Sequence, residues 1–314
     1  MNESTVSLID RCRAGDRGAL ARLISLIEGG GAGARAVSAA IFPSSVDSWT
    51  VGITGAPGAG KSTLTDRLVG EFVSDASAIG VLAIDPSSPF SGGAILGDRI
   101  RMQTHATDPR VFIRSMATRG HLGGLAAATP QAARLLSVAG FATVLIETVG
   151  VGQVEVEIAG HADTTVVVVN PGWGDAVQAN KAGLMEIADV FVVNKADRDG
   201  ALDTVREIES MLMMAVERSW VPPIVSTVAT SGQGVGALAA AVSAHRDYTV
   251  ASGTAGVRRR DRLADELRGI AVAIAAERAL SRCDGAEFVA LVAAMESGAI
   301  DPYTAAETLT AVER

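Results

Sequence analysis

Cysteine, histidine and aromatic residues are scarce in this 314-residue chain, which contains 2 Cys, 4 His, 7 Phe, 3 Trp and 2 Tyr. Cys12 and Cys283 lie near opposite ends and form no CxxC pair, so neither a disulfide framework nor a cysteine zinc site is expected. The shortage of aromatic residues argues against a base-stacking surface for single-stranded nucleic acid. His121 has no second ligand at a fixed spacing, so a structural role is expected for it.

Positive charge and long apolar runs are also limited. The formal net charge is −8, so we expect no broad electrostatic footprint for nucleic acid or for an anionic membrane. The chain shows no signal-peptide pattern, and its longest apolar runs are strand-length or contain polar breaks, which predicts a cytoplasmic protein. Hydrophobic residues make up 48% of the chain, enough for the core of one large α/β domain with additions, or of two domains.

The chain is organised around a glycine-rich loop, GAPGAGKST, which lies between a predicted strand at 51–54 and a predicted helix from Leu64. Glycines allow several backbone N–H groups to converge on one anion, and the helix N-terminus adds partial positive charge. Lys61 is expected to contact the β- and γ-phosphates, and the Ser62 hydroxyl to ligate Mg²⁺. The predicted phosphate-binding residues are Gly55, Ala56, Pro57, Gly58, Ala59, Gly60, Lys61, Ser62 and Thr63.

Acidic residues close two of the buried apolar runs. Asp85 follows the run 79–84, and Glu147 follows the run 141–146. Because ligands bind at the carboxyl ends of parallel strands, both carboxylates are candidates for the Mg²⁺ shell. For Asp85 alone, the alternative is a turn residue before proline. Glu147 occupies the place of a Walker-B carboxylate and is expected to hold Mg²⁺ through water.

Two further residues are candidates for catalysis beside Lys61 and Glu147. Asp98 lies in a glycine-rich segment that is too apolar for a solvated linker, and it is expected to reach the metal or its waters. Gln153 is the only nearby amide that is suited to orient an attacking water.

A second motif predicts the identity of the base. Asn194, Lys195 and Asp197 form an NKxD sequence directly after the apolar run 190–193. The Asp197 carboxylate accepts both N1–H and N2–H of guanine, the Lys195 stem covers the ring, and Asn194 braces the loop. Backbone N–H groups after the last strand are expected to reach guanine O6, from Thr230, Ser231 and Gly232. The predicted nucleotide is therefore GTP or GDP, with Mg²⁺.

The apolar runs predict an α/β P-loop NTPase, with a mostly parallel sheet covered by helices on both faces. Residues 1–47 are predicted to be a helical extension with a break at Gly15 and a flexible joint at 29–33, and residues 48–250 the GTPase domain. Residues 251–314 are predicted to be helical, with apolar stripes that suit an oligomer contact. The basic triplet at 258–260 is expected to be a solvated helix start.

With these residues laid out, the chain resembles the MeaB/ArgK family of SIMIBI-class P-loop GTPases. The resemblance covers nearly the whole chain and includes DPSS at 85–88, GDR at 97–99, MATRG at 116–120, ETVGVGQ at 147–153 and NKAD at 194–197. It implies a homodimeric GTPase that serves as a chaperone of adenosylcobalamin-dependent methylmalonyl-CoA mutase, gating cofactor loading and protecting the mutase from inactivation. It also implies that Ser62, Asp85, Asp98 and Glu147 surround Mg²⁺, and that the loop at 171–181 is a switch that senses the mutase.

Other functions remain open at this point. The sequence does not say which acyl-CoA mutase is the client. An ethylmalonyl- or isobutyryl-CoA enzyme is the alternative to the methylmalonyl-CoA enzyme. A metal-delivery GTPase would need histidine runs or cysteine pairs, which this chain lacks. A kinase linked to amino-acid transport is disfavoured by the guanine-reading Asp197.

Overall fold

A computed structural model describes residues 4–44, 48–74, 77–86, 103–105, 107–118, 124–148, 161–172, 178–214 and 219–311. The chain divides into two compact units. The first contains Met1–Gly120 and Gly124–Arg262, and the second contains Leu263–Arg314.

The first unit is built on a seven-stranded sheet with the order β3-β2-β4-β1-β5-β6-β7, in which every pairing is parallel. The prediction of an α/β P-loop fold is therefore confirmed, and each predicted strand is present. The central strand β1 pairs with β4 and β5, so the segments that leave these strands meet at one edge. The strands are β1 (Trp49–Gly55), β2 (Ile79–Pro86), β3 (Val111–Thr118), β4 (Thr143–Thr148), β5 (Thr164–Val169), β6 (Val190–Asn194) and β7 (Ile224–Thr227).

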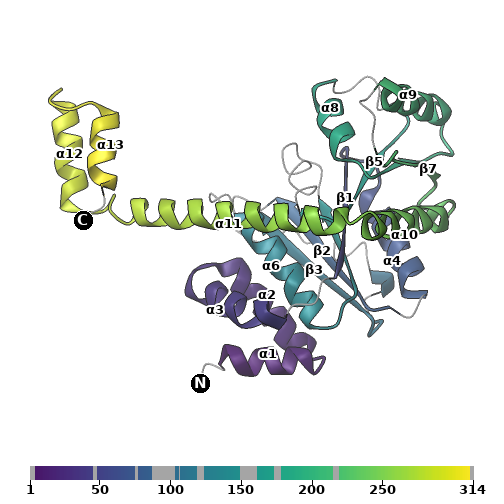
Figure 1. The fold of residues 1–314 in the computed structure, drawn as a ribbon, viewed down its shortest axis with the longest axis horizontal. Helices are drawn as coiled ribbons and strands as arrows, with labels where there is room; N and C mark the ends of the chain where they lie inside the picture. Colours follow the sequence, from purple (N-terminus) through teal and green to yellow (C-terminus); the bar gives the residue numbers. More distant parts are fainter. Residues whose placement is uncertain are drawn as a thin grey trace. The chain divides into compact units, whose positions relative to one another are not determined.

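Helices cover both faces of this sheet (Figure 1). One face packs against α4 and α10 in a core that includes Leu64 and Leu238. The other face packs against α6 near β2 and β4, and against α8 and α9 near β5 and β6. Burial on both sides explains why the strands are almost continuously apolar. The helices are α4 (Lys61–Ser74), α6 (Gly124–Val138), α8 (Gln178–Ile187), α9 (Ala201–Met214) and α10 (Val235–Ala251).

Three N-terminal helices follow one another: α1 (Thr5–Arg13), α2 (Arg17–Gly29) and α3 (Gly31–Ile41), with a 3-10 turn at Phe42–Ser44. Helix α2 packs against α6 and β3, α3 packs against α6, and α1 packs against α2 and α3. The predicted break near Gly15 is confirmed, because Gly15 has a φ of +89° and Asp16 caps α2. The predicted flexible joint is wrong. Gly30, with a φ of +68°, turns the chain directly into α3, which is held in place by its fully buried Val37 and Ile41.

The edge strand β3 is tied to these helices by charged side chains. The Arg17 guanidinium donates to the carbonyl oxygens of Asp108 (3.1 Å) and Val111 (2.8 Å). Arg114, on β3, donates to Glu28 Oε2 at 2.5 Å in a largely buried ion pair. A 3-10 turn at Gln103–His105 precedes β3 and contacts α4. The helical extension is therefore part of the same compact unit as the sheet.

Helix α11 (Thr254–Leu280) begins within the first unit. Arg258, in its first turns, donates to Asp189 Oδ2 at 3.0 Å and Oδ1 at 2.9 Å. The Arg258 side chain is 42% exposed, so the predicted solvated triplet is incomplete for this residue only in that it also pairs with Asp189. The sequence pattern could not reveal this, because the partner carboxylate lies 69 residues away in the chain.

The second unit contains the remainder of α11, together with α12 (Ala286–Glu296) and α13 (Pro302–Thr310), which lie side by side (Figure 1). Asp301 caps α13 and Pro302 occupies its first turn. Among the described residues of this unit, only Ala305 and Leu309 are buried hydrophobic side chains. None of the helices in the described part of the chain is long and apolar enough to cross a bilayer.

Candidate nucleotide-binding site

The glycine-rich loop joins β1 to α4, and two of its glycines are required by close contacts. Gly55 has a φ of +131°, and a Cβ there would collide with the backbone oxygen of Val168. Gly60 has a φ of +92°, and a Cβ there would lie 2.5 Å from Asn194 Nδ2. The loop can therefore curl against β5 and β6 only because these positions have no side chain.

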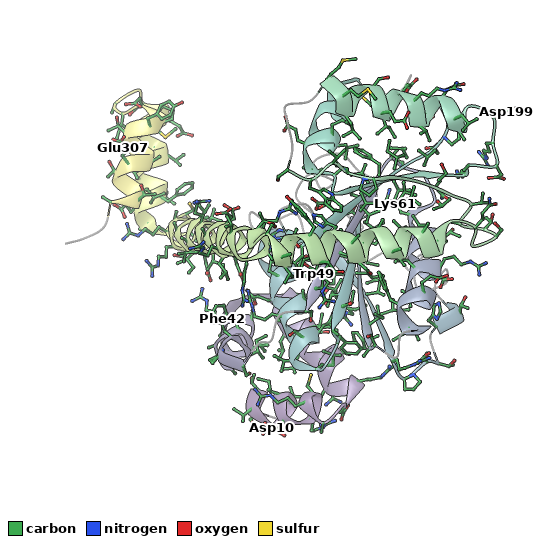
Figure 2. The ribbon with its side chains drawn as sticks, turned by 45° about the vertical axis from the view of Figure 1, so that its right-hand side comes forward. Asp10, Phe42, Trp49, Lys61, Asp199 and Glu307 are labelled. Carbon is green, nitrogen blue, oxygen red and sulfur yellow. The ribbon has the colours of Figure 1, made fainter. Side chains whose placement is uncertain are left out.

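Lys61, labelled in Figure 2, is 6% exposed at the start of α4. Its ammonium group donates to the carbonyl oxygens of Gly55 (2.5 Å) and Ala56 (3.1 Å). These contacts hold a positive charge against the inside of the loop. A phosphate group that entered the loop would meet both this charge and the N-terminus of α4.

Ser62 and Glu147 meet beside the loop. The Ser62 hydroxyl donates to Glu147 Oε1 at 2.6 Å, and Glu147 is 1% exposed. The contact follows from the parallel pairing of β1 with β4, in which Ile53 lies opposite Glu147. A hydroxyl and a carboxylate next to a phosphate site are the donor set that Mg²⁺ prefers, so the residues present fit this ion.

The other predicted metal and catalytic residues are described less completely. Asp85 is the residue before the last in β2, two residues beyond Ala83, which lies opposite Glu147. The side chain of Asp85 lies outside the described residues, as do Asp98 and Gln153. His121 and Trp173 also lie outside them.

Asn194 connects three parts of the site. Its Nδ2 donates to the carbonyl oxygen of Ala59 at 2.8 Å, in the phosphate loop. Its Oδ1 accepts from Thr227 Oγ1 and from the backbone N–H of Ala229, each at 3.1 Å. With Asn194 only 2% exposed, these bonds hold the end of β6 to the phosphate loop and to the segment after β7.

Lys195 and Asp197 follow at the surface. Lys195 has a φ of +58°, uncommon for a residue other than glycine, and its Nζ donates to the carbonyl oxygen of Gly58 at 2.6 Å. Its stem therefore spans the distance between the base motif and the phosphate loop. Asp197 is exposed and accepts no hydrogen bond from the described residues, so its carboxylate is available to a ligand.

The turn after β7 is closed by its own backbone. Val228 donates to the carbonyl oxygen of Gln233, and the N–H groups of Ser231 and Gly232 both donate to that of Val228. The N–H of Thr230 has no acceptor among the described residues. Of the amides predicted to face guanine O6, Thr230 is thus the one without an internal partner. Sequence reasoning missed Thr227 and Ala229, because no local pattern marks their bonds to Asn194.

Comparison with known proteins shows which family the chain belongs to. Residues 20–284 match the family described as "Methylmalonyl Co-A mutase-associated GTPase MeaB". This chain belongs to the MeaB family of GTPases. A Pyrococcus abyssi relative that is named as a GTPase is 48% identical over 306 residues, covering 96% of this chain and 94% of the relative. GTPase ArgK of Escherichia coli is 35% identical over 263 residues, covering 81% of this chain and 80% of ArgK.

Two further similarities concern the fold and a longer protein. The crystal structure of a LAO/AO transport system kinase superposes with a TM-score of 0.72 at 24% identity, covering 99% of this chain and 98% of that one. This likeness shows the fold. The fused isobutyryl-CoA mutase of Cupriavidus metallidurans is 42% identical over 204 residues, which are 64% of this MeaB-family chain and 19% of that protein.

Proposed function

We propose that this MeaB-family GTPase is a chaperone of adenosylcobalamin-dependent methylmalonyl-CoA mutase, which uses GTP hydrolysis to gate cofactor loading and to protect the mutase. The observation that carries the proposal is the match of residues 20–284 to a family described as mutase-associated. The fused isobutyryl-CoA mutase supports it, because that protein joins a similar segment to a mutase in one polypeptide. The same observation favours isobutyryl-CoA mutase as the second candidate client.

The site supplies the groups that GTP hydrolysis requires. In this proposal, Lys61 and the loop amides neutralise the phosphates, and Ser62 with Glu147 would hold Mg²⁺ together with Asp85 and Asp98. When bound, Mg²⁺ would supply further charge neutralisation for the phosphate oxygens. Gln153 orients a water toward the γ-phosphorus. A bond from that water to phosphorus forms, the bond to the bridging oxygen breaks, and GDP and phosphate result.

The base is read by groups from two strands in this proposal. Asp197 accepts the N1–H and N2–H of guanine, and the turn at Thr230, Ser231 and Gly232 donates to O6. The structure supports this arrangement, because Asn194 is hydrogen-bonded both to the phosphate loop and to Ala229 at the start of that turn.

Coupling to the mutase requires segments that respond to the γ-phosphate. In this proposal, the chain after Glu147 and the loop at 171–181 change conformation when the phosphate is lost, and the mutase binds one of the two states. The proposed functional form is a homodimer formed through residues 251–314. Its support is the apolar surface of the second unit, on which Leu280, Val289 and Met295 are exposed.

The test is phosphate release from MgGTP by the purified chain, alone and with purified methylmalonyl-CoA mutase or isobutyryl-CoA mutase. We expect at least about a tenfold stimulation by the methylmalonyl enzyme, since GTPases of this type are slow without their partners. Lys61→Ala is the control, because it removes the loop's cation and any remaining activity is background. Stimulation by the isobutyryl enzyme alone would contradict the proposed client, and stimulation by neither would contradict the chaperone proposal.

A further inference from the structure

Arg67 lies on α4, on the helix that begins at Lys61 and about 9 Å further along its axis. Its guanidinium reaches away from the phosphate loop toward the turn after β7. Nε donates to the carbonyl oxygen of Ala229 at 3.2 Å, and Nη2 donates to the carbonyl oxygen of Thr230 at 2.9 Å. The planar guanidinium group therefore holds two successive peptide groups of the turn after β7.

These two bonds orient the amides of the turn. In a planar trans peptide, the C=O of one residue and the N–H of the next point in opposite directions. Because the Ala229 carbonyl faces Arg67, the N–H of Thr230 faces away from it. Because the Thr230 carbonyl also faces Arg67, the N–H of Ser231 faces away, and it donates to Val228. The Thr230 N–H is left without an acceptor among the described residues.

The same turn is held from its other side. Asn194 Oδ1 accepts from the Ala229 N–H at 3.1 Å, and Gly234 closes the turn with a φ of +78°, where a Cβ would collide with Ser226. Ala229 is thus bonded through its N–H to the base motif and through its C=O to α4. Without Arg67, the Thr230 peptide would lose its side-chain restraint, since the described residues offer it no other side-chain bond.

We propose that Arg67 is a positioning residue for guanine recognition: it sets the peptide plane that directs the Thr230 N–H to guanine O6. This inference rests on the proposed function, in which Asp197 reads N1–H and N2–H and the turn reads O6. In addition, O6 recognition depends on a side chain of α4, the helix that follows the phosphate loop. One guanidinium thus joins the phosphate end of the nucleotide site to its base end.

Nucleotide analogues distinguish the base contacts. IDP keeps O6 and N1–H but lacks the N2 amine, whereas 2-aminopurine ribonucleoside diphosphate keeps the amine but lacks both O6 and N1–H. A defect in the O6 contact lowers affinity for GDP and IDP and leaves the 2-aminopurine nucleotide unchanged. A general loss of structure weakens all three nucleotides together.

The experiment measures dissociation constants of the three diphosphates by calorimetry with Mg²⁺, for wild type, Arg67→Gln, Arg67→Lys and the matched control Arg206→Gln. Arg206 is an exposed arginine on α9 that bonds Asp203. We expect Arg67→Gln to weaken GDP and IDP about 3- to 10-fold and to leave the 2-aminopurine nucleotide within about twofold. Arg67→Lys should give a smaller effect, because lysine keeps one cationic donor although it lacks the fork, and Arg206→Gln should have none.

One result would overturn the inference while leaving the proposed function intact. It is a ratio of GDP to 2-aminopurine affinity that is unchanged in both Arg67 variants, whether no nucleotide is weakened or all three are weakened equally. If wild type itself does not prefer GDP over the 2-aminopurine nucleotide, O6 recognition by the turn is wrong and the inference falls with it. Thermal unfolding of each variant checks that the fold is retained.

Discussion

At the scale of single residues, the site combines buried groups that hold it together with exposed groups left for a ligand. Lys61, Asn194 and Glu147 are all buried. Lys61 bonds its own loop, whereas Asn194 and Glu147 bond segments distant in the chain. Asp197 is exposed and accepts no bond from the described residues. This division is expected of a binding site, because its scaffold must be rigid before the ligand arrives while its reading group must be free.

Asp197→Asn tests base reading at this scale. The carboxylate accepts from two guanine donors, whereas an amide presents a donor that suits the C2 carbonyl of xanthine. We expect GDP affinity to fall roughly 10- to 100-fold and XDP affinity to rise, measured by competition for the site. Asp199→Asn is the matched control, since Asp199 is exposed in the same loop and is labelled at the edge of the unit in Figure 2. A variant that still prefers GDP to XDP would show that Asp197 does not read the base.

At the scale of elements, the start of α11 is attached to the sheet edge opposite the nucleotide site. Asp189 lies just before β6 and accepts from Arg258 and from the backbone N–H of Thr165 at 2.9 Å. Asp163, just before β5, pairs with Arg262 and accepts from the Thr50 N–H at 2.8 Å. Helix α11 is therefore joined to the starts of three central strands by buried or half-buried ion pairs.

The protonation of Asp189 makes this attachment sensitive to acid. Burial acts to raise its pKa, but the His245 ring, whose Nε2 lies 3.2 Å away, and the Arg258 guanidinium outweigh burial and lower the pKa below its usual 3.8. The same pair raises the pKa of Arg258. A carboxylate whose pKa is lowered by folding stabilises the folded state above its unfolded pKa, and that contribution disappears as the pH falls through the folded value.

Asp189→Asn should therefore destabilise the protein in a pH-dependent way. Near pH 7 we expect a loss of about 1–3 kcal/mol, because the amide leaves Arg258 without its anionic partner. The difference from wild type should shrink as the pH falls below the usual 3.8 of the carboxyl group. Urea unfolding midpoints between pH 7 and pH 3 measure it, with Asp203→Asn as control because Asp203 and its partner Arg206 are both exposed. A difference that is the same at every pH would contradict this account.

At the scale of the whole molecule, the two units differ in how they are stabilised. The first has three hydrophobic clusters around its sheet. The described part of the second, by contrast, exposes several large apolar side chains along α11 and α12, and small helical units rarely bury enough apolar surface alone. Exposed members of this surface are Leu267, Val272, Leu280, Val289, Val292 and Met295.

These exposed side chains predict self-association. We expect sedimentation equilibrium to give twice the mass of one chain, because a second copy would cover the apolar surface. Val289→Glu places a charge on that surface and should shift the population toward monomer, whereas the control Val6→Glu changes a similarly exposed valine on α1 and should not (66% and 65% exposed). Monomeric wild-type protein at micromolar concentration would contradict the proposed dimer.

Local patterns were sufficient for much of the fold. The predicted runs at 51–54, 79–84, 141–146 and 190–193 correspond to β1, β2, β4 and β6 of the sheet. Local patterns failed where a distant contact decided the outcome. The glycine-rich stretch at 29–33 reads as a joint by composition, but the burial of Val37 and Ile41 makes its second half a helix. Composition describes only intrinsic flexibility, and packing overrides it.

The sequence alone determined the groups that are neighbours along the chain: the phosphate loop up to Lys61 and Ser62, and the base motif from Asn194 to Asp197. Their chemistry depends on residue type and short spacing, both of which are readable without coordinates. Only the tertiary structure decided which of them meet. Ser62 and Glu147 are 85 residues apart, Asn194 and Ala59 are 135 apart, and Arg67 and Ala229 are 162 apart. These contacts follow from the position of β1 between β4 and β5, because strand order sets which distant chain segments share an edge of the sheet.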